Sequence, residues 1–152
     1  MEPSIFTWLV AAVHLLALPL GMAAVWARAL ALSGPLDAAG LRRVFVADNL
    51  WGLAAALWLG TGIWRAFGGI EKGALYYMGN PVFHLKMGLF LLVLALEIWP
   101  MVTLIRWRIR TGRGLAVDTG RARLFARLSQ VEAAVVVAIV LAATALARGF
   151  GV

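Results

Sequence analysis

The sequence predicts an all-α fold: an integral membrane four-helix bundle with both termini on the outer side. Two observations support this prediction. Four apolar stretches fill most of the 152 residues, and each is long enough to cross a bilayer, which takes about 20 apolar residues in a helix. Arginines gather in two of the loops, which sets the expected orientation. Because lipid offers no hydrogen-bond partners to the backbone, the four stretches must be helices.

Composition agrees with a single membrane domain covering residues 1–152. The chain is 63% hydrophobic and 14% charged, and its mean hydropathy is +0.91. A soluble four-helix bundle would carry a polar stripe along each helix, and these stretches do not. The chain has no cysteine, which excludes a disulfide framework and thiolate ligands.

The first two helices are expected at residues 5–32 and 44–67. Glu2 is the only charge before Arg28. The N-terminus therefore lacks the basic region of a signal peptide, and we expect a retained helix. The Ser-Gly-Pro sequence at residues 33–35 ends the first helix, because glycine and proline interrupt helices.

The last two helices are expected at residues 81–105 and 128–147. Pro81 opens the third helix, where its missing N–H does no harm. The 106–127 segment between them is polar and is a candidate for an amphipathic extension of a neighbouring helix.

The net charge of +7 is unevenly distributed along the chain. The 106–127 segment holds seven arginines and the 33–43 loop holds two, whereas the 68–80 loop holds only Lys72. Positively charged loops stay in the cytoplasm, so both termini and the 68–80 loop should face outward. Topology and anionic headgroups account for the arginines, and we expect no nucleic-acid partner.

Several ionisable residues lie at membrane depth, where they are costly and therefore functional candidates. His14 lies about nine residues into its helix, roughly 13 Å deep, and is the strongest candidate. Structural explanations are open for others, since Asp48 could pair with a nearby loop arginine and Lys86 could reach the interface. The remaining candidates are His84, Glu97 and Glu132.

Spacing groups some of these residues. His14, Gly21 and Arg28 recur every seven positions and share one helix face. Glu97 and Glu132 are expected, with Asp48 and nearby arginines, to form an inner polar network. This network is a candidate proton path.

Two embedded histidines on different helices indicate haem b, because imidazole is a usual axial ligand and a four-helix bundle can enclose a porphyrin. His14 is the expected axial ligand. His84 or Lys86 would be the second ligand, or a contact to a propionate or substrate. Two histidines give poor support for zinc, whereas copper stays open because methionines offer soft sulfur.

Particular motifs resemble known families. Residues 79–86 (Gly-Asn-Pro-Val-Phe-His-Leu-Lys) and 106–108 (Arg-Trp-Arg) resemble an uncharacterised family of small bacterial four-helix membrane proteins. More distantly, Ala12-Val13-His14 and His84-Leu85-Lys86 resemble the HemJ-type protoporphyrinogen IX oxidases and copper-resistance membrane proteins. The HemJ-type pattern continues with an Asn-Glu pair in the fourth helix, which Ser129-Gln130-Val131 replaces here.

The resemblance implies a haem b protein of the bacterial cytoplasmic membrane, with His14, His84 and Lys86 at or near the cofactor. The expected role is electron transfer or HemJ-like oxidation, with a porphyrin or quinone-type substrate or redox partner. The alternatives are a non-enzymatic membrane assembly factor and a small permease for copper or another solute. The substrate and a homo-oligomeric state are left open.

The arginine distribution generates a topology prediction. Reporter fusions at Val152 and within the 68–80 loop should report the outer side, and a fusion at Gly114 the cytoplasm, because arginine-rich loops are retained inside. Alkaline phosphatase and green fluorescent protein fusions measure this directly. A cytoplasmic signal from the C-terminus would reverse the orientation.

Overall fold

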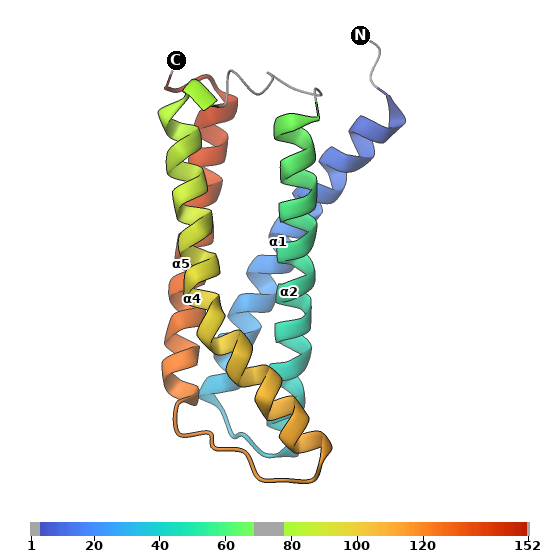
Figure 1. Cartoon of the computed structure of the whole chain (residues 1–152), viewed down its shortest axis with the longest axis vertical. Helices are drawn as coiled ribbons and strands as arrows, with labels where there is room; N and C mark the ends of the chain where they lie inside the picture. The colour runs from blue at the N-terminus through green and yellow to red at the C-terminus, as the bar shows by residue number, and fades with distance from the viewer. Residues whose placement is uncertain (1–3, 69–77, 152) are drawn as a thin grey trace.

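The protein is described by a computed structural model that covers residues 4–68 and 78–151 (Figure 1). Within these ranges four long helices follow one another, each long and apolar enough to cross a membrane. They are α1 (Ile5–Ser33), α2 (Ala38–Phe67), α4 (Pro81–Gly112) and α5 (Ala122–Ala147). The predicted all-α, four-span fold is confirmed. Most of the expected outer loop, residues 69–77, lies outside the described part of the chain.

Three helix ends differ from the expected ones. The second helix begins at Ala38 rather than 44, the third continues to Gly112 rather than 105, and the fourth begins at Ala122 rather than 128. Falling hydropathy marked the expected ends, but packing extends the helices. Trp107 and Ala122, both in the added turns, are buried. The 106–127 segment thus extends both neighbouring helices.

A hydrogen bond explains where α2 begins, and a backbone conformation explains where α4 ends. The Asp37 side chain accepts the backbone N–H of Gly40 at 2.7 Å and starts α2 as its N-cap. At the other loop, Gly114 has φ 69° and lies directly after the α4 cap residue. Glycine adopts this left-handed conformation at low cost, so α4 ends there.

The hydrophobic core joins all four helices only in part of the bundle. α1 packs along both α2 and α5, and α4 packs along α5. A lower cluster comprises Leu32, Leu41, Val44, Leu104, Trp107, Ala122, Phe125 and Ala126. A middle cluster comprises Ala24, Val25, Trp51, Val93, Ala133, Val136 and Ile139. Towards the other end Phe83 and Leu146 join only α4 and α5, and the first turns of α1 lean away from the bundle (Figure 1).

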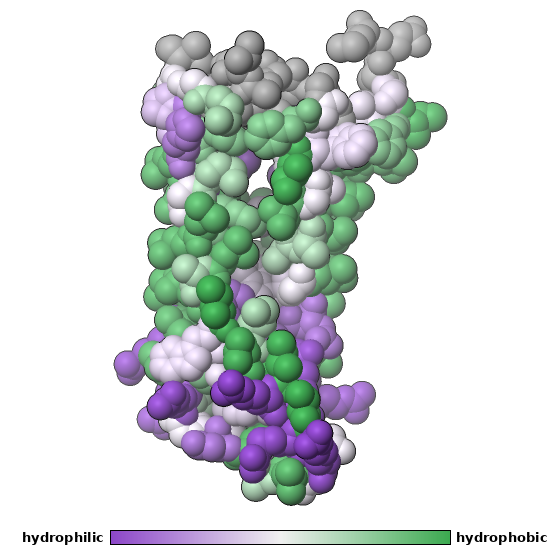
Figure 2. Space-filling view, in the orientation of Figure 1, coloured by the Kyte–Doolittle hydropathy of each residue, from purple (hydrophilic) through white to green (hydrophobic). Residues whose placement is uncertain are grey.

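The outward-facing surface is apolar, as expected for helices in lipid. Only 17–33% of each apolar window is buried inside the protein. Figure 2 shows mainly hydrophobic side chains over the upper and middle bundle and most of the hydrophilic ones gathered at one end. That end carries the 34–37 and 113–121 loops and is called the arginine-rich end below. Such a surface matches a bilayer-spanning body with one charged end.

A bend in α4 brings its last turns across to α2. Figure 1 shows the change of direction in the yellow-to-orange part of the helix, and Pro100 lies inside the helix there. Proline removes a backbone hydrogen bond and bends helices. Beyond the bend, Arg108 donates to the Asp48 carboxylate and the Asn49 side chain, both at 2.5 Å. These contacts connect α4 to α2.

Replacing Pro100 with alanine should straighten α4 and move its end away from α2. A bend of about 20° acting over about 12 residues displaces the helix end by roughly 6 Å. Spin labels on Val46→Cys and Ile109→Cys, introduced into this cysteine-free chain, measure the separation by double electron–electron resonance. Pro19→Ala in α1 is the control and should leave this distance unchanged. An unchanged distance in Pro100→Ala would show that packing alone bends α4.

Candidate functional site

A single buried arginine lies where the four helices meet. Arg28 of α1 is 0% exposed, and its guanidinium has five N–H donors. Its Nε donates to Ser129 Oγ at 3.0 Å, and Nη1 donates to Asp48 at 2.9 Å and Glu97 at 2.7 Å. Its Nη2 donates to Glu97 at 2.7 Å and Glu132 at 2.6 Å. All five donors are therefore paired with side chains from the other three helices.

Arg28, Asp48, Glu97, Arg108 and Glu132 form what we call the Arg28 cluster. The expected polar network of Asp48, Glu97, Glu132 and nearby arginines is confirmed as a set of contacts, but Asp48 does not meet Arg42 or Arg43. It bridges Arg28 and Arg108 instead. The bend of α4 explains this pairing, because it carries Arg108 to α2 and so places a second guanidinium beside the carboxylate.

The Arg28 cluster has an imbalance of formal charge. Two guanidinium groups face three carboxylates, which leaves one excess negative charge if every group is ionised. Glu132 Oε1 is buried and has no hydrogen-bond partner among the described residues. An uncompensated charge is costly in a low-dielectric interior. The arrangement therefore suits a group that takes up one proton.

Sequence reasoning did not place Arg28 at the centre of this network, because its spacing alone does not show that acceptors from three other helices converge on it. The spacing with His14 and Gly21 was the available signal. A Cβ on Gly21 would lie 3.2 Å from the Ala54 Cβ, so α1 and α2 approach closely on this face. The face shared by the three residues is thus the one that packs into the bundle.

His14 is held by a defined hydrogen bond to α2. Its Nδ1 lies 2.8 Å from Thr61 Oγ1, and Thr61 Oγ1 donates to the Leu57 carbonyl at 2.5 Å. A carbonyl can only accept, so the single hydroxyl hydrogen of Thr61 points to Leu57. The Thr61 oxygen must then accept from His14 Nδ1–H. Neutral His14 consequently carries its lone pair on Nε2.

His84 has different surroundings. Its side chain is exposed, and its Nε2 donates to the Met78 carbonyl at 2.8 Å, next to the start of α4. Lys86 is partly buried on the same helix. The hydrogen bonds of the two imidazoles go to different partners, Thr61 for His14 and Met78 for His84.

A small cavity lies between the His14 region and the Arg28 cluster. It has a volume of about 30 Å³, enough for about two water molecules. Its walls include Trp51, Trp58, Phe90, Val93, Glu97 and Ile139. The Trp58 ring lies 6.2 Å from the His14 ring, centroid to centroid. Figure 2 shows an opening in the upper half of the molecule, between the α1–α2 and α4–α5 pairs.

The described ranges, 4–68 and 78–151, contain no cluster of acidic and histidine side chains suited to a metal ion. No group of three or more such residues there could hold a metal ion. The His14 imidazole, held by Thr61, and the Arg28 cluster are thus the two best-defined polar sites among the described residues.

Removing the buried guanidinium should strongly destabilise the bundle. Arg28→Met leaves three carboxylates without their shared partner, and breaking such a buried pair costs about 3–5 kcal/mol. Arg28→Lys should lose less, because the charge remains but the five-donor geometry does not. Unfolding in mixed micelles, followed by circular dichroism, measures the free energy of unfolding of each variant. The control is Arg127→Met on the exposed surface of α5, and equal losses in both variants would contradict the assignment.

Comparison with known proteins identifies a family but no characterised relative. No curated protein and no solved structure matches the chain. Residues 6–151 match the family described as "Predicted membrane protein (DUF2214)". The match covers almost the entire chain, including all four helices and the Arg28 cluster. The chain therefore belongs to the DUF2214 family of predicted membrane proteins.

Proposed function

We propose that this protein binds haem b through His14 and has a redox role in the membrane, with the Arg28 cluster as its proton-holding group. The observation that carries the proposal is the hydrogen bond from His14 Nδ1–H to Thr61. Histidines that bind a metal through one ring nitrogen donate the other N–H to a fixed acceptor, which sets the tautomer and orientation of the ring. Thr61 supplies that acceptor.

Among the described side chains His14 could supply one ligand to a haem iron. The space inside the bundle limits where a porphyrin could lie. The enclosed cavity beside Trp58 holds about 30 Å³, far less than a porphyrin needs. The group would have to occupy the opening between the helix pairs in Figure 2. Bound haem b supplies one-electron chemistry. The resemblance of Ala12-Val13-His14 and His84-Leu85-Lys86 to HemJ-type proteins is a second ground for this choice.

For the second ligand we favour Lys86 over His84. The His84 imidazole is exposed and lies next to the start of α4. Lys86, partly buried and one turn closer to the centre of α4 than its start, is the better candidate. A porphyrin or quinone-type redox partner would approach from the same open side.

The first test is the absorption spectrum of the full chain, purified in detergent after expression with added haem precursor. Wild type should show a Soret band and sharp reduced α and β bands. His14→Ala should lose haem. Thr61→Val should lower haem affinity about 10- to 100-fold, because the ring loses its orienting acceptor, whereas Thr61→Ser should retain it. His84→Ala is the matched control and should keep the wild-type spectrum.

Two outcomes would overturn the haem proposal. A colourless wild-type protein that takes up no haem in reconstitution is one, and an unchanged spectrum in His14→Ala is the other. Either result would favour a non-enzymatic assembly factor. That second candidate rests on the complete pairing of the Arg28 donors, which also suits a purely fastening role.

A separate test addresses the proton. If the Arg28 cluster holds one proton, infrared difference spectra should contain the C=O stretching band of a protonated carboxyl group at neutral pH. Glu132→Gln should remove or shift this band, because Glu132 has the unpaired buried oxygen. Asp118→Asn, at an exposed loop position, should not affect it. A band that is absent from wild type would mean that all three carboxylates are ionised.

A further inference from the structure

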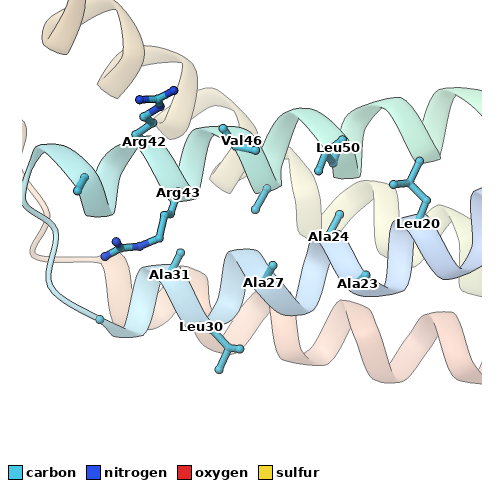
Figure 3. Close-up of a pocket in the computed structure, with 13 residues that line it drawn as sticks. Leu20, Ala23, Ala24, Ala27, Leu30, Ala31, Arg42, Arg43, Val46 and Leu50 are labelled. Atoms are coloured by element: carbon cyan, nitrogen blue, oxygen red, sulfur yellow. The ribbon is translucent and has the colours of Figure 1, made fainter.

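A long groove runs between α1 and α2 at the arginine-rich end, away from the Arg28 cluster. Its volume is about 790 Å³, within the range of pockets that bind small molecules. The α1 wall is formed by alanines, including Ala23, Ala27 and Ala31, and the α2 wall includes Val46 and Leu50 (Figure 3). Ala23 and Ala27 are exposed, so the groove opens towards the surrounding lipid.

Two cations stand at one end of this groove. Arg42 and Arg43 belong to its lining, and both are exposed. Figure 3 shows Arg43 extending from α2 towards α1 near Ala31, whereas the side chain of its neighbour Arg42 points away from α1. Neither guanidinium forms an ion pair with an acidic side chain in the described part of the chain. The groove is therefore apolar along its length and positively charged at the membrane surface.

We propose that this groove binds one anionic phospholipid, with an acyl chain along the alanine wall and the phosphate at Arg43, where the adjacent Arg42 adds positive charge. The shape and charge match both parts of such a molecule. Small side chains leave room for a chain of methylene groups, and arginine pairs well with phosphate. By the loop-charge rule, the arginine-rich end faces the cytoplasmic leaflet, where basic groups attract anionic headgroups.

Charge disfavours a second copy of the protein as the occupant. A copy inserted in the same orientation brings its own arginine-rich end to the same depth. The Arg42 and Arg43 guanidinium groups of the two copies would then come close together, and like-charge contacts at interfaces are costly. A phospholipid supplies the missing negative charge instead.

The test is native mass spectrometry of the full-length protein in detergent, titrated with phosphatidylglycerol or phosphatidylcholine. Wild type should retain one phosphatidylglycerol in preference to phosphatidylcholine. Arg42→Gln with Arg43→Gln should weaken phosphatidylglycerol binding about thirtyfold, from about fivefold for each arginine. The matched control, Arg123→Gln with Arg127→Gln, removes two exposed arginines from α5 at the same end and should leave binding within about twofold.

A second variant tests the apolar part of the groove. Ala27→Leu places a larger side chain in the wall, and because Ala27 is exposed the bundle should stay folded by circular dichroism. It should weaken phosphatidylglycerol binding while Arg42 and Arg43 remain. Phosphatidylglycerol binding that survives both groove variants, or that inorganic phosphate displaces at millimolar concentration, would overturn the proposal. A dimer in wild type that Ala27→Leu dissociates would assign the groove to a second copy and would equally overturn it.

Discussion

The five hydrogen bonds of the Arg28 guanidinium are the interaction on which the arrangement of the helices depends. A charged side chain without partners is hardly tolerated inside a membrane protein. Arg28 therefore requires acceptors from α2, α4 and α5 at one point and at one depth. Satisfying one side chain fixes the relative rotation of four helices. Apolar packing alone would leave these rotations weakly specified, because lipid tails compete well for apolar surfaces.

The bundle consequently has two unlike halves. Towards the arginine-rich end the helices are held by the Arg28 cluster, by the lower core around Phe125 and by Arg108 on α2. Towards the termini, the described core joins only α4 and α5. His14 lies on the open side and the Arg28 cluster on the closed side.

The sequence was sufficient to predict the number, order and class of the elements. The bilayer allows few structures, and the hydropathy of each stretch directly indicates which residues can lie in it. It was insufficient for the helix ends, since Asp37 and Gly114 act through local hydrogen bonds and φ angles that hydropathy ignores. Some residues of the site were predicted from the sequence and others were not. Glu97 and Glu132 were expected in one network, but Arg28 was placed only on the helix face that it shares with His14 and Gly21. Thr61 was missed entirely, because a threonine in an apolar helix carries no signal until its neighbour is known.

The long separations in the Arg28 cluster bear on how the chain is made. The acceptors on Asp48, Glu97 and Glu132 lie 20, 69 and 104 positions after Arg28. During synthesis α1 enters the membrane with an unpaired cation five residues before its end at Ser33, close enough for the side chain to reach the headgroups. The guanidinium can leave that interface completely only after α5 has been inserted. A chain that lacks α5 would leave the guanidinium without Glu132 and Ser129, so the full set of five hydrogen bonds marks the arrival of the last helix.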